Sequence, residues 1–235
     1  ARHVEVATDA AVGQLAAGVA HEIGNPLAAI LGYVDLLRTE DPRAPLSDDE
    51  RRDVLGRVRS ETQRIHRIIR DLLEYSRPGR EEVAAVDPHA ALDSAVKLLE
   101  PQARFRGVEM RTIPADAPWP QVEAPRGRLE QVFVNLLLNA ADAMGGSGRI
   151  TVSATTNDAG RVVLEVADEG PGVPRHLARK IFDPFFTTKE PGHGTGLGLS
   201  ISRAIVETCG GTLELVPTPA GERGARFALT LSPRS

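Results

Sequence analysis

The stretch RGRLEQVFVNLLLNAADAM, residues 126–144, decides the fold of the second half of the chain. Apolar residues occupy most of this stretch, which predicts a largely buried helix. Asn135 and Asn139 are four residues apart and therefore share one face of the helix. Buried amides need partners, and a metal ion with its bound phosphates would supply them. Helix capping or a network of amides is the alternative.

Short strand and helix patterns surround this helix from about residue 81 to the end of the chain. They predict strands at 83–86, 108–113, 150–155, 162–166, 213–216 and 226–231, and helices at 88–100 and 199–208. We expect the last two strands to form a hairpin. The alternation predicts an α+β sandwich with helices on one face of a mixed sheet.

The N-terminal part of the chain has a different pattern, which consists of two long apolar stripes. The first covers residues 12–37 at steps of three and four, and the second covers residues 54–72 after a capping box at Ser47–Glu50. Two helices with a short connection form an antiparallel hairpin. Because one hairpin cannot bury both stripes, we expect two copies to pair into a four-helix bundle. A plain dimerisation hairpin is the alternative.

Composition limits the functional class. The chain has 235 residues, of which 41% are hydrophobic and 26% charged, as in ordinary globular proteins. The formal net charge of −4 argues against a general nucleic-acid binder. Cys209 is the single cysteine, which excludes an intramolecular disulfide and any multi-cysteine metal site. No apolar run is long enough to cross a membrane, so we expect no membrane contact by this fragment.

Two short motifs carry groups that could react or form hydrogen bonds with a ligand. His21 lies outside the apolar seam of the first helix, so its imidazole should face solvent and act as a nucleophile, with Glu22 accepting the ring N–H. Asp168 follows a strand and precedes Gly170 and Gly172, which let a flat ring approach the backbone. Its carboxylate would accept a hydrogen bond from an exocyclic amine. An ordinary surface histidine and a generic Asp-Gly turn are the alternatives.

A glycine-rich stretch, Gly192–Leu199, precedes a predicted helix. Its amides could bind phosphate at the helix N-terminus. The stretch matches neither the dinucleotide fingerprint nor the P-loop. A flexible linker is the alternative.

The order and spacing of these motifs resemble the catalytic core of two-component sensor histidine kinases. His-Glu-x-x-Asn-Pro, Asn-x-x-x-Asn-Ala, Asp-x-Gly-x-Gly and Gly-Thr-Gly-Leu-Gly follow in the family's order, and Ile181–Phe186 resembles its F-box. The resemblance covers nearly the whole chain. It implies a dimerisation and histidine phosphotransfer domain over residues 1–78, and an α/β-sandwich ATP-binding domain of the Bergerat fold over residues 79–235.

The same resemblance assigns roles to individual residues. His21 matches the phosphoacceptor, and Glu22 matches the acid that orients or deprotonates it. Asn139 matches the residue that binds Mg²⁺ together with the ATP phosphates, and Glu130 is a candidate for orienting a water beside the metal. The positions that match the family's ATP-binding residues are Asn135, Asn139, Asp168, Gly170, Gly172, Lys189, Gly194, Thr195, Gly196, Leu197 and Gly198.

The implied activity is that of a protein-histidine kinase with ATP and Mg²⁺ as cofactors. It would phosphorylate His21 and pass the phosphoryl group to an aspartate of a response-regulator receiver domain. Asn25 matches the position that some relatives use to dephosphorylate the regulator; simple tolerance of asparagine before Pro26 is the alternative. We expect a homodimer, no nucleic-acid partner and a cytoplasmic core, whose full-length parent could be membrane-anchored.

Two other classes remain open at this point. An ATPase of the same superfamily that uses hydrolysis for conformational cycling would share the nucleotide site but would not need His21. A catalytically silent scaffold would keep the hairpin and lose the nucleotide contacts.

Overall fold

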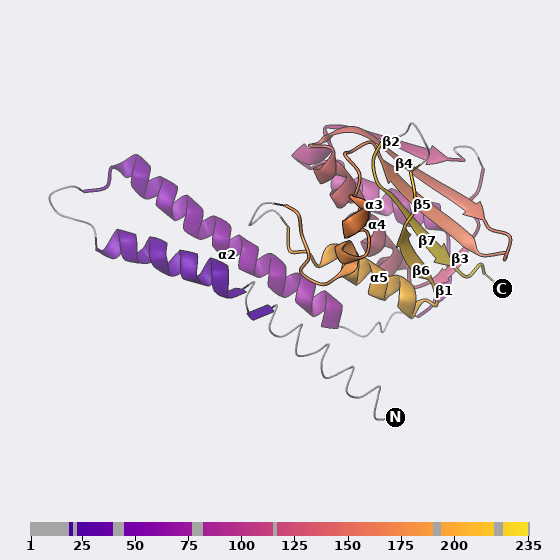
Figure 1. Cartoon of the computed structure of the whole chain (residues 1–235), viewed down its shortest axis with the longest axis horizontal. Coiled ribbons are helices and arrows are strands. Elements are labelled where there is room, and N and C mark those ends of the chain that lie inside the picture. Colours follow the sequence, from indigo (N-terminus) through magenta and orange to yellow (C-terminus); the bar gives the residue numbers. More distant parts are fainter. Residues whose placement is uncertain are drawn as a thin grey trace, which may run out of the picture. The chain divides into compact units, whose positions relative to one another are not determined.

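A computed structural model describes residues 19–20, 23–39, 45–76, 82–114, 117–189, 194–218 and 223–234 (Figure 1). The chain divides into two compact units. The first unit is Ala1–Arg77 with Pro184–Leu197, and the second is Pro78–Asp183 with Gly198–Ser235. Among the residues described, none of the helices combines the length and apolar character that a membrane span requires.

The first unit contains a helix over residues 23–38 and the long helix α2 (Asp48–Ser76). The predicted capping box begins α2: the Ser47 N–H donates to Glu50 Oε2 at 2.9 Å, and the Glu50 N–H donates to Ser47 Oγ at 3.3 Å. These bonds satisfy amides that have no partner inside the helix. Arg57 of α2 hydrogen-bonds to Tyr33 of the first helix, so the two helices lie side by side as a hairpin (Figure 1).

The second unit is built on a five-stranded sheet with the order β2-β4-β5-β7-β6. The strands are β2 (Gly107–Ile113), β4 (Ser147–Thr156), β5 (Val162–Asp168), β6 (Thr212–Leu215) and β7 (Arg226–Leu231). β2 and β4 run parallel, and the other neighbours run antiparallel. The predicted mixed sheet and the predicted β6–β7 hairpin are therefore confirmed.

Three helices cover one face of this sheet (Figure 1): α3 (Pro88–Leu99), α4 (Arg126–Ala143) and α5 (Gly198–Thr208). α4 is the helix predicted from residues 126–144, and its Phe133, Leu136 and Leu137 side chains are fully buried. Leu164 of β5 and Leu229 of β7 are also fully buried. The core of the unit thus lies between α4 and the central strands.

A second, two-stranded sheet pairs β1 (Ala84–Val86) with β3 (Val122–Ala124). The sequence did not predict β3, because three residues are too few to display an alternating pattern. Three 3₁₀ turns, η1 (Ala103–Phe105), η2 (Arg175–Leu177) and η3 (Lys180–Phe182), complete the described elements of the unit.

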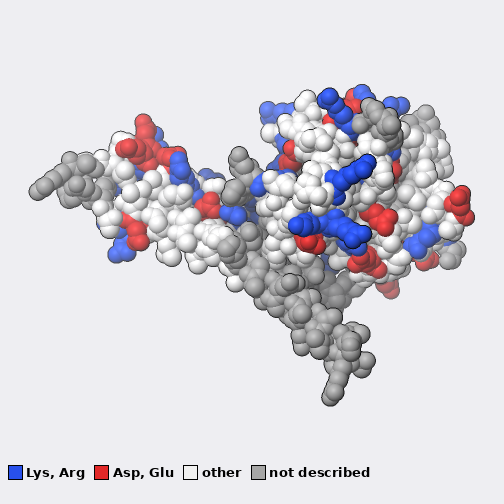
Figure 2. Space-filling view, in the orientation of Figure 1, with Lys and Arg blue, Asp and Glu red and all other residues white. Residues whose placement is uncertain are grey.

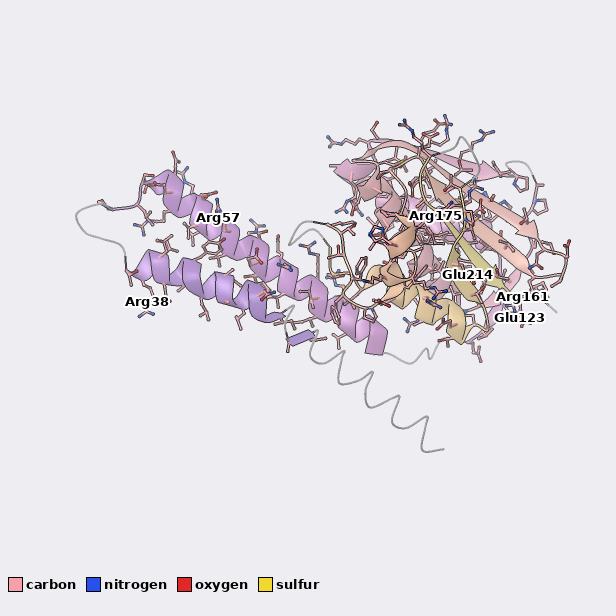
Figure 3. The ribbon with its side chains drawn as sticks, viewed as in Figure 1. Arg38, Arg57, Glu123, Arg161, Arg175 and Glu214 are labelled. Atoms are coloured by element: carbon pink, nitrogen blue, oxygen red, sulfur yellow. The ribbon has the colours of Figure 1, made fainter. Side chains whose placement is uncertain are left out.

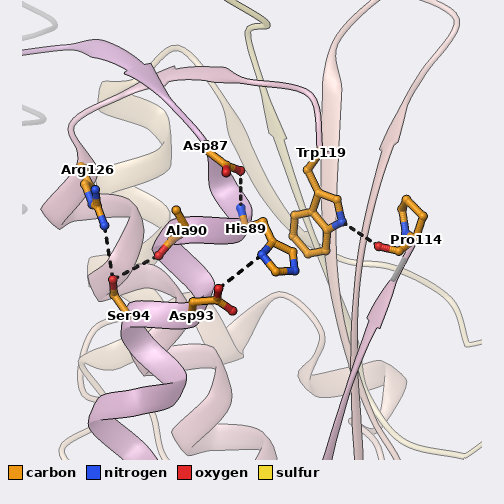
Figure 4. A network of polar contacts seen from close by, with 8 residues as sticks. All are labelled: Asp87, His89, Ala90, Asp93, Ser94, Pro114, Trp119 and Arg126. Carbon is orange, nitrogen blue, oxygen red and sulfur yellow. Dashed lines mark hydrogen bonds and ion pairs between the residues drawn. The ribbon is translucent and has the colours of Figure 1, made fainter. Parts of the chain in front are cut away.

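Polar contacts hold the start of α3 against the segment that follows β2 (Figure 4). The Asp87 carboxylate caps α3 by accepting the His89 N–H at 2.9 Å. The His89 ring meets Trp119 edge to face at 5.1 Å, and Trp119 Nε1 donates to the Pro114 carbonyl at 3.3 Å. Trp119 is the chain's single tryptophan and is buried, so its fluorescence reports on the folding of the second unit.

Charged side chains of both signs are interspersed over the described surface that Figure 2 presents. This mixture agrees with a nearly balanced composition of 28 basic and 32 acidic residues.

Candidate functional site

A pocket of about 710 Å³ opens in the second unit, where β5 ends and β4 begins. Three segments line it: the end of α4 with the start of β4 (Ala143, Met144 and Ser147), the loop after β5 (residues 169–173), and Arg223 with Gly224 before β7. The volume lies within the range of small-molecule sites in proteins.

Asp168, the last residue of β5, directly precedes the pocket-lining loop and is only 7% exposed. Its Oδ1 accepts two backbone hydrogen bonds, from the Gly170 N–H at 2.8 Å and from the Ala225 N–H at 3.2 Å. Its Oδ2 has no hydrogen-bond partner among the described residues. One carboxylate oxygen is therefore fixed by the fold, and the other is available to an external donor.

Burial raises the pKa of the Asp168 carboxyl above its usual value, and the hydrogen bonds from Ala225 and Gly170 partly oppose this effect. Both backbone N–H groups donate to the same carboxylate oxygen. They stabilise the charged form of the carboxyl and also fix the orientation of the group. A buried carboxylate with a shifted pKa beside a pocket is a candidate for a binding site.

Glycines from two loops close around this carboxylate. A Cβ on Gly170 would lie 2.8 Å from Asp168 Oδ1, and a Cβ on Gly224 would lie 1.6 Å from the Asp168 carbonyl oxygen. Gly172 has a φ of 77° and would place a Cβ 2.9 Å from the Gly224 oxygen. Only glycine fits these positions. The sequence predicted Gly170 and Gly172 but missed Gly224, whose only signal was its place in a turn before a strand.

Asn135 and Asn139 of α4 have different environments. Asn135 Nδ2 donates to the Gly198 carbonyl and to Ser202 Oγ, both at 3.3 Å. These bonds give Asn135 a structural role, as the alternative to ligand binding required, and they join α4 to the first two turns of α5. The half-buried Asn139 side chain has no hydrogen-bond partner among the described residues, so its amide remains available to a ligand. A neutral amide oxygen with no partner suits Mg²⁺.

Glu130, near the start of α4, accepts from Arg126 Nε at 3.0 Å. Arg126 thereby fixes one oxygen of the carboxylate that the sequence proposed for orienting a water.

The remaining predicted residues do not all belong to the second unit. His21 and Glu22 lie outside the described residues, and Asn25 is exposed on the first helix. Gly198 begins α5, whereas the other predicted phosphate-loop residues belong to the first unit; they are Lys189, Gly194, Thr195, Gly196 and Leu197.

The conformation of the segment that contains Lys189 and Leu197 requires a glycine at position 196. Gly196 has a φ of 68°, and a Cβ on it would lie 2.3 Å from the backbone carbon of Phe185. Phe185 itself has a φ of 65°, which is unusual for a residue with a side chain. The Lys189 N–H donates to Thr187 Oγ1 at 3.1 Å, and the Leu197 N–H donates to Thr195 Oγ1 at 3.4 Å.

Two family models match the chain. The model described as "His Kinase A (phospho-acceptor) domain" matches residues 11–81. The model described as "Histidine kinase-, DNA gyrase B-, and HSP90-like ATPase" matches residues 125–235. The sensor histidine kinase ZraS of Escherichia coli O157:H7 is 38% identical over 221 residues, which cover 94% of this chain and 46% of ZraS. The chain thus spans about half the length of the curated relatives that it matches first.

Solved structures give the same result. Full-length ShkA in complex with AMPPNP matches with a TM-score of 0.63 and 28% identity, over 95% of this chain and 46% of ShkA. Histidine kinase ThkA in complex with the response regulator TrrA matches with a TM-score of 0.71 and 30% identity, over 95% of this chain and 62% of that one. These likenesses confirm the expected fold, a helical hairpin followed by an α/β sandwich of the GHKL type.

We expect Asp168→Asn to stabilise the ligand-free second unit at neutral pH by roughly 1 kcal/mol, because an amide oxygen can still accept both backbone N–H groups without a buried charge. The raised pKa means that the folded chain holds this proton more tightly than the unfolded chain. Stability is therefore lost as the pH rises from the unfolded value through the folded one, and the parent bears the cost of the buried charge above that range.

Urea unfolding, followed by Trp119 fluorescence, measures this difference. The gain of Asp168→Asn over the parent should shrink as the pH falls toward the usual carboxyl value of 3.8. A variant less stable than the parent at pH 7 would contradict the interpretation.

Proposed function

Because the chain belongs to the family of two-component sensor histidine kinases, we propose that it is the catalytic core of such a kinase. It uses ATP and Mg²⁺ to phosphorylate His21 and then passes the phosphoryl group to an aspartate of a response regulator. The observation that carries the proposal is the Asp168 site, where a buried carboxylate has one oxygen fixed and the other available.

The available oxygen of Asp168 selects adenine. Oδ2 accepts a hydrogen bond from the exocyclic amine of adenine, and Gly170, Gly172 and Gly224 line the pocket without side chains, so that the flat ring approaches the backbone. Guanine carries a carbonyl at the equivalent position, and two acceptors facing each other would leave both without a donor. ShkA, which shares the fold, was solved with AMPPNP, and this supports an adenine nucleotide as the ligand.

The phosphates lie toward the start of α5. The helix begins at Gly198, and its first amides and its dipole attract negative charge. Asn139 provides an amide oxygen for Mg²⁺, which neutralises charge on the phosphates when it is bound. Gly194, Thr195, Gly196 and Leu197 continue the phosphate loop, and Lys189 contacts the terminal phosphate. Asn135 acts mainly by holding α5 in place.

The transfer itself needs a nucleophile and a proton acceptor. The neutral imidazole of His21 attacks the γ-phosphorus, an N–P bond forms, and the bond from phosphorus to the β–γ bridging oxygen breaks to release ADP. Glu22 accepts a hydrogen bond from the N–H of the other ring nitrogen, holds the ring in the reactive tautomer and takes up that proton as the N–P bond forms. Both roles rest on the match of residues 11–81 to the phospho-acceptor domain.

We expect His21→Gln to abolish acid-labile labelling by [γ-³²P]ATP while AMPPNP binding is retained, since the pocket, Asp168 and Asn139 belong to the other unit. His66→Gln is the matched control, because His66 is an exposed histidine on α2 of the same unit. Labelling that persists in His21→Gln would contradict the assignment. Phosphate release without labelling in the parent would instead favour the ATPase that cycles by hydrolysis.

Both helices of the hairpin have large apolar side chains that remain exposed to solvent. Leu27, Leu31 and Val34 of the first helix are 48%, 58% and 37% exposed, and Leu55 and Leu73 of α2 are 52% and 55% exposed. The three residues of the first helix follow steps of four and three, so they form one face. A second copy of the chain covers this face in a four-helix bundle.

We expect Leu31→Glu to convert the dimer to monomer, because it places a charge in the centre of that face. Sedimentation at micromolar concentration measures the change. Arg38→Glu is the control, at a 76%-exposed position on the same helix that Figure 3 labels. A parent that sediments only as monomer would exclude the bundle.

Asn25 supports the reverse reaction, dephosphorylation of the regulator. It is exposed on the first helix. In the sequence it follows His21 by four residues, the spacing that brings two side chains to one face of a helix. Its amide can donate to and accept from a water, so it can hold that water in line with an aspartyl phosphate on a bound regulator.

We expect Asn25→Ala to keep autophosphorylation near normal and to slow regulator dephosphorylation at least tenfold, or about 1.4 kcal/mol of barrier. The measurement uses the cognate regulator, phosphorylated beforehand and freed of ATP. Equal dephosphorylation rates for parent and variant would leave Asn25 with no more than a tolerated place before Pro26.

A further inference from the structure

The ladder between β4 and β5 ends in an unusual way beside the pocket. Its last pair is Ile150 with Asp168, so the next donor along β4 is the N–H of Arg149. The side chain of Glu169 accepts this N–H through Oε2 at 3.1 Å. A carboxylate thus replaces the backbone acceptor that a longer ladder would supply. The backbone of β5 can therefore leave the sheet at Glu169 without a lost hydrogen bond.

The guanidinium of Arg149 holds the same carboxylate from a second direction. Arg149 Nη1 donates to Glu169 Oε1 at 3.2 Å, and Arg149 Nε donates to Glu109 Oε2 on β2, also at 3.2 Å. The hydrogen bond to Glu109, with the charges of Glu109 and Glu169, raises the pKa of Arg149. The three side chains join the neighbouring strands β2, β4 and β5 at the end of the sheet where the pocket opens.

This cluster anchors one wall of the pocket. Glu169 lines the pocket with Gly170, Pro171 and Gly172, none of which has a polar side chain. The wall is therefore held by two side chains, Asp168 through the Gly170 N–H and Glu169 through Arg149. Arg149 lies two residues after Ser147, which lines another wall. The contact between Glu169 and Arg149 thus fixes one wall of the pocket relative to another.

We propose that Glu169 is a positioning residue of the nucleotide site, which holds loop 169–173 in its binding conformation through Arg149 and Glu109. The proposal rests on the proposed function. The side chains of Glu169, Arg149 and Glu109 are 52%, 41% and 64% exposed, so their ion pairs add little to global stability. Their effect falls on nucleotide affinity, because a loop that is ordered beforehand costs less to bind.

Charge repulsion alone predicts the opposite change in nucleotide affinity when the Glu169 carboxylate is removed. A carboxylate in the wall of a site for a polyanion repels the ligand, so its removal would tighten binding if charge alone mattered. The direction of the change therefore separates positioning from repulsion.

The test compares Glu169→Ala and Glu169→Gln with the parent. In Glu169→Ala the Kd for AMPPNP and the KM for ATP in His21 labelling should rise about fivefold, with kcat and the Trp119 unfolding midpoint unchanged. Glu169→Gln keeps an acceptor for the Arg149 N–H and should recover part of the loss. Arg149→Ala should weaken binding as well, and its effect should not add to that of Glu169→Ala in the double variant, because both remove one contact.

Glu214→Ala is the matched control. It removes the same charge from an exposed position on β6 of the same sheet (Figure 3), and it should bind AMPPNP as the parent does. Tighter binding by Glu169→Ala, or affinity equal to that of Glu214→Ala, would overturn the proposal. A parent that fails to bind AMPPNP would overturn the proposed function instead, and this result is distinguishable from the others.

Discussion

The close approach of two backbone segments at Asp168 is the constraint on which the site depends. The Asp168 N–H donates to the Ala225 carbonyl at 3.0 Å, and the Ala225 N–H returns a bond to the Asp168 carboxylate. This contact leaves no space for a Cβ on Gly224. The end of β5 and the start of β7 are thus held together by the same carboxylate that we propose reads the base. Pocket and sheet therefore cannot be altered separately at this point.

Helix α4 connects this site to the hydrophobic core. Phe133, Leu136 and Leu137 are fully buried, so α4 has little freedom to shift. Asn135, near the middle of α4, donates to Gly198 and Ser202 of α5, and Ala143, the last residue of α4, lines the pocket. One rigid element therefore positions both the start of α5 and the pocket, which we propose bind the phosphates and the base. This explains why the apolar helix carries Asn135.

Local patterns in the sequence predicted most of the elements, and contacts between distant residues explain what they missed. The capping box at Ser47–Glu50 and the periodicity of α4 are local signals, and both predicted the element within one or two residues. Strand β3 is too short to have a period. Arg149 pairs with Glu109 and Glu169, which are 40 and 20 residues away, and no spacing rule connects them. The sequence left open whether Asn135 binds a ligand or makes a structural hydrogen bond. The structural role is evident only from its contacts with Gly198 and Ser202, which are more than 60 residues away.

Under the proposed function, the charged groups that surround α4 would give a bound nucleotide a direction. Asp168 and Glu169 both lie at the pocket end, where an anionic ligand would be repelled, but each is balanced locally: Asp168 by two amides, and Glu169 by Arg149 and its N–H. At the other end, the start of α5 contributes a partial positive charge. Ala143 and Asn135 are eight residues apart on α4, which corresponds to about 12 Å along the helix axis. This separation is comparable to the span from the base to the terminal phosphate of an extended nucleotide. Under the proposed function, the acidic end therefore tolerates the base and the phosphates are drawn toward α5, so the helix that supports the core would also determine which way the nucleotide binds.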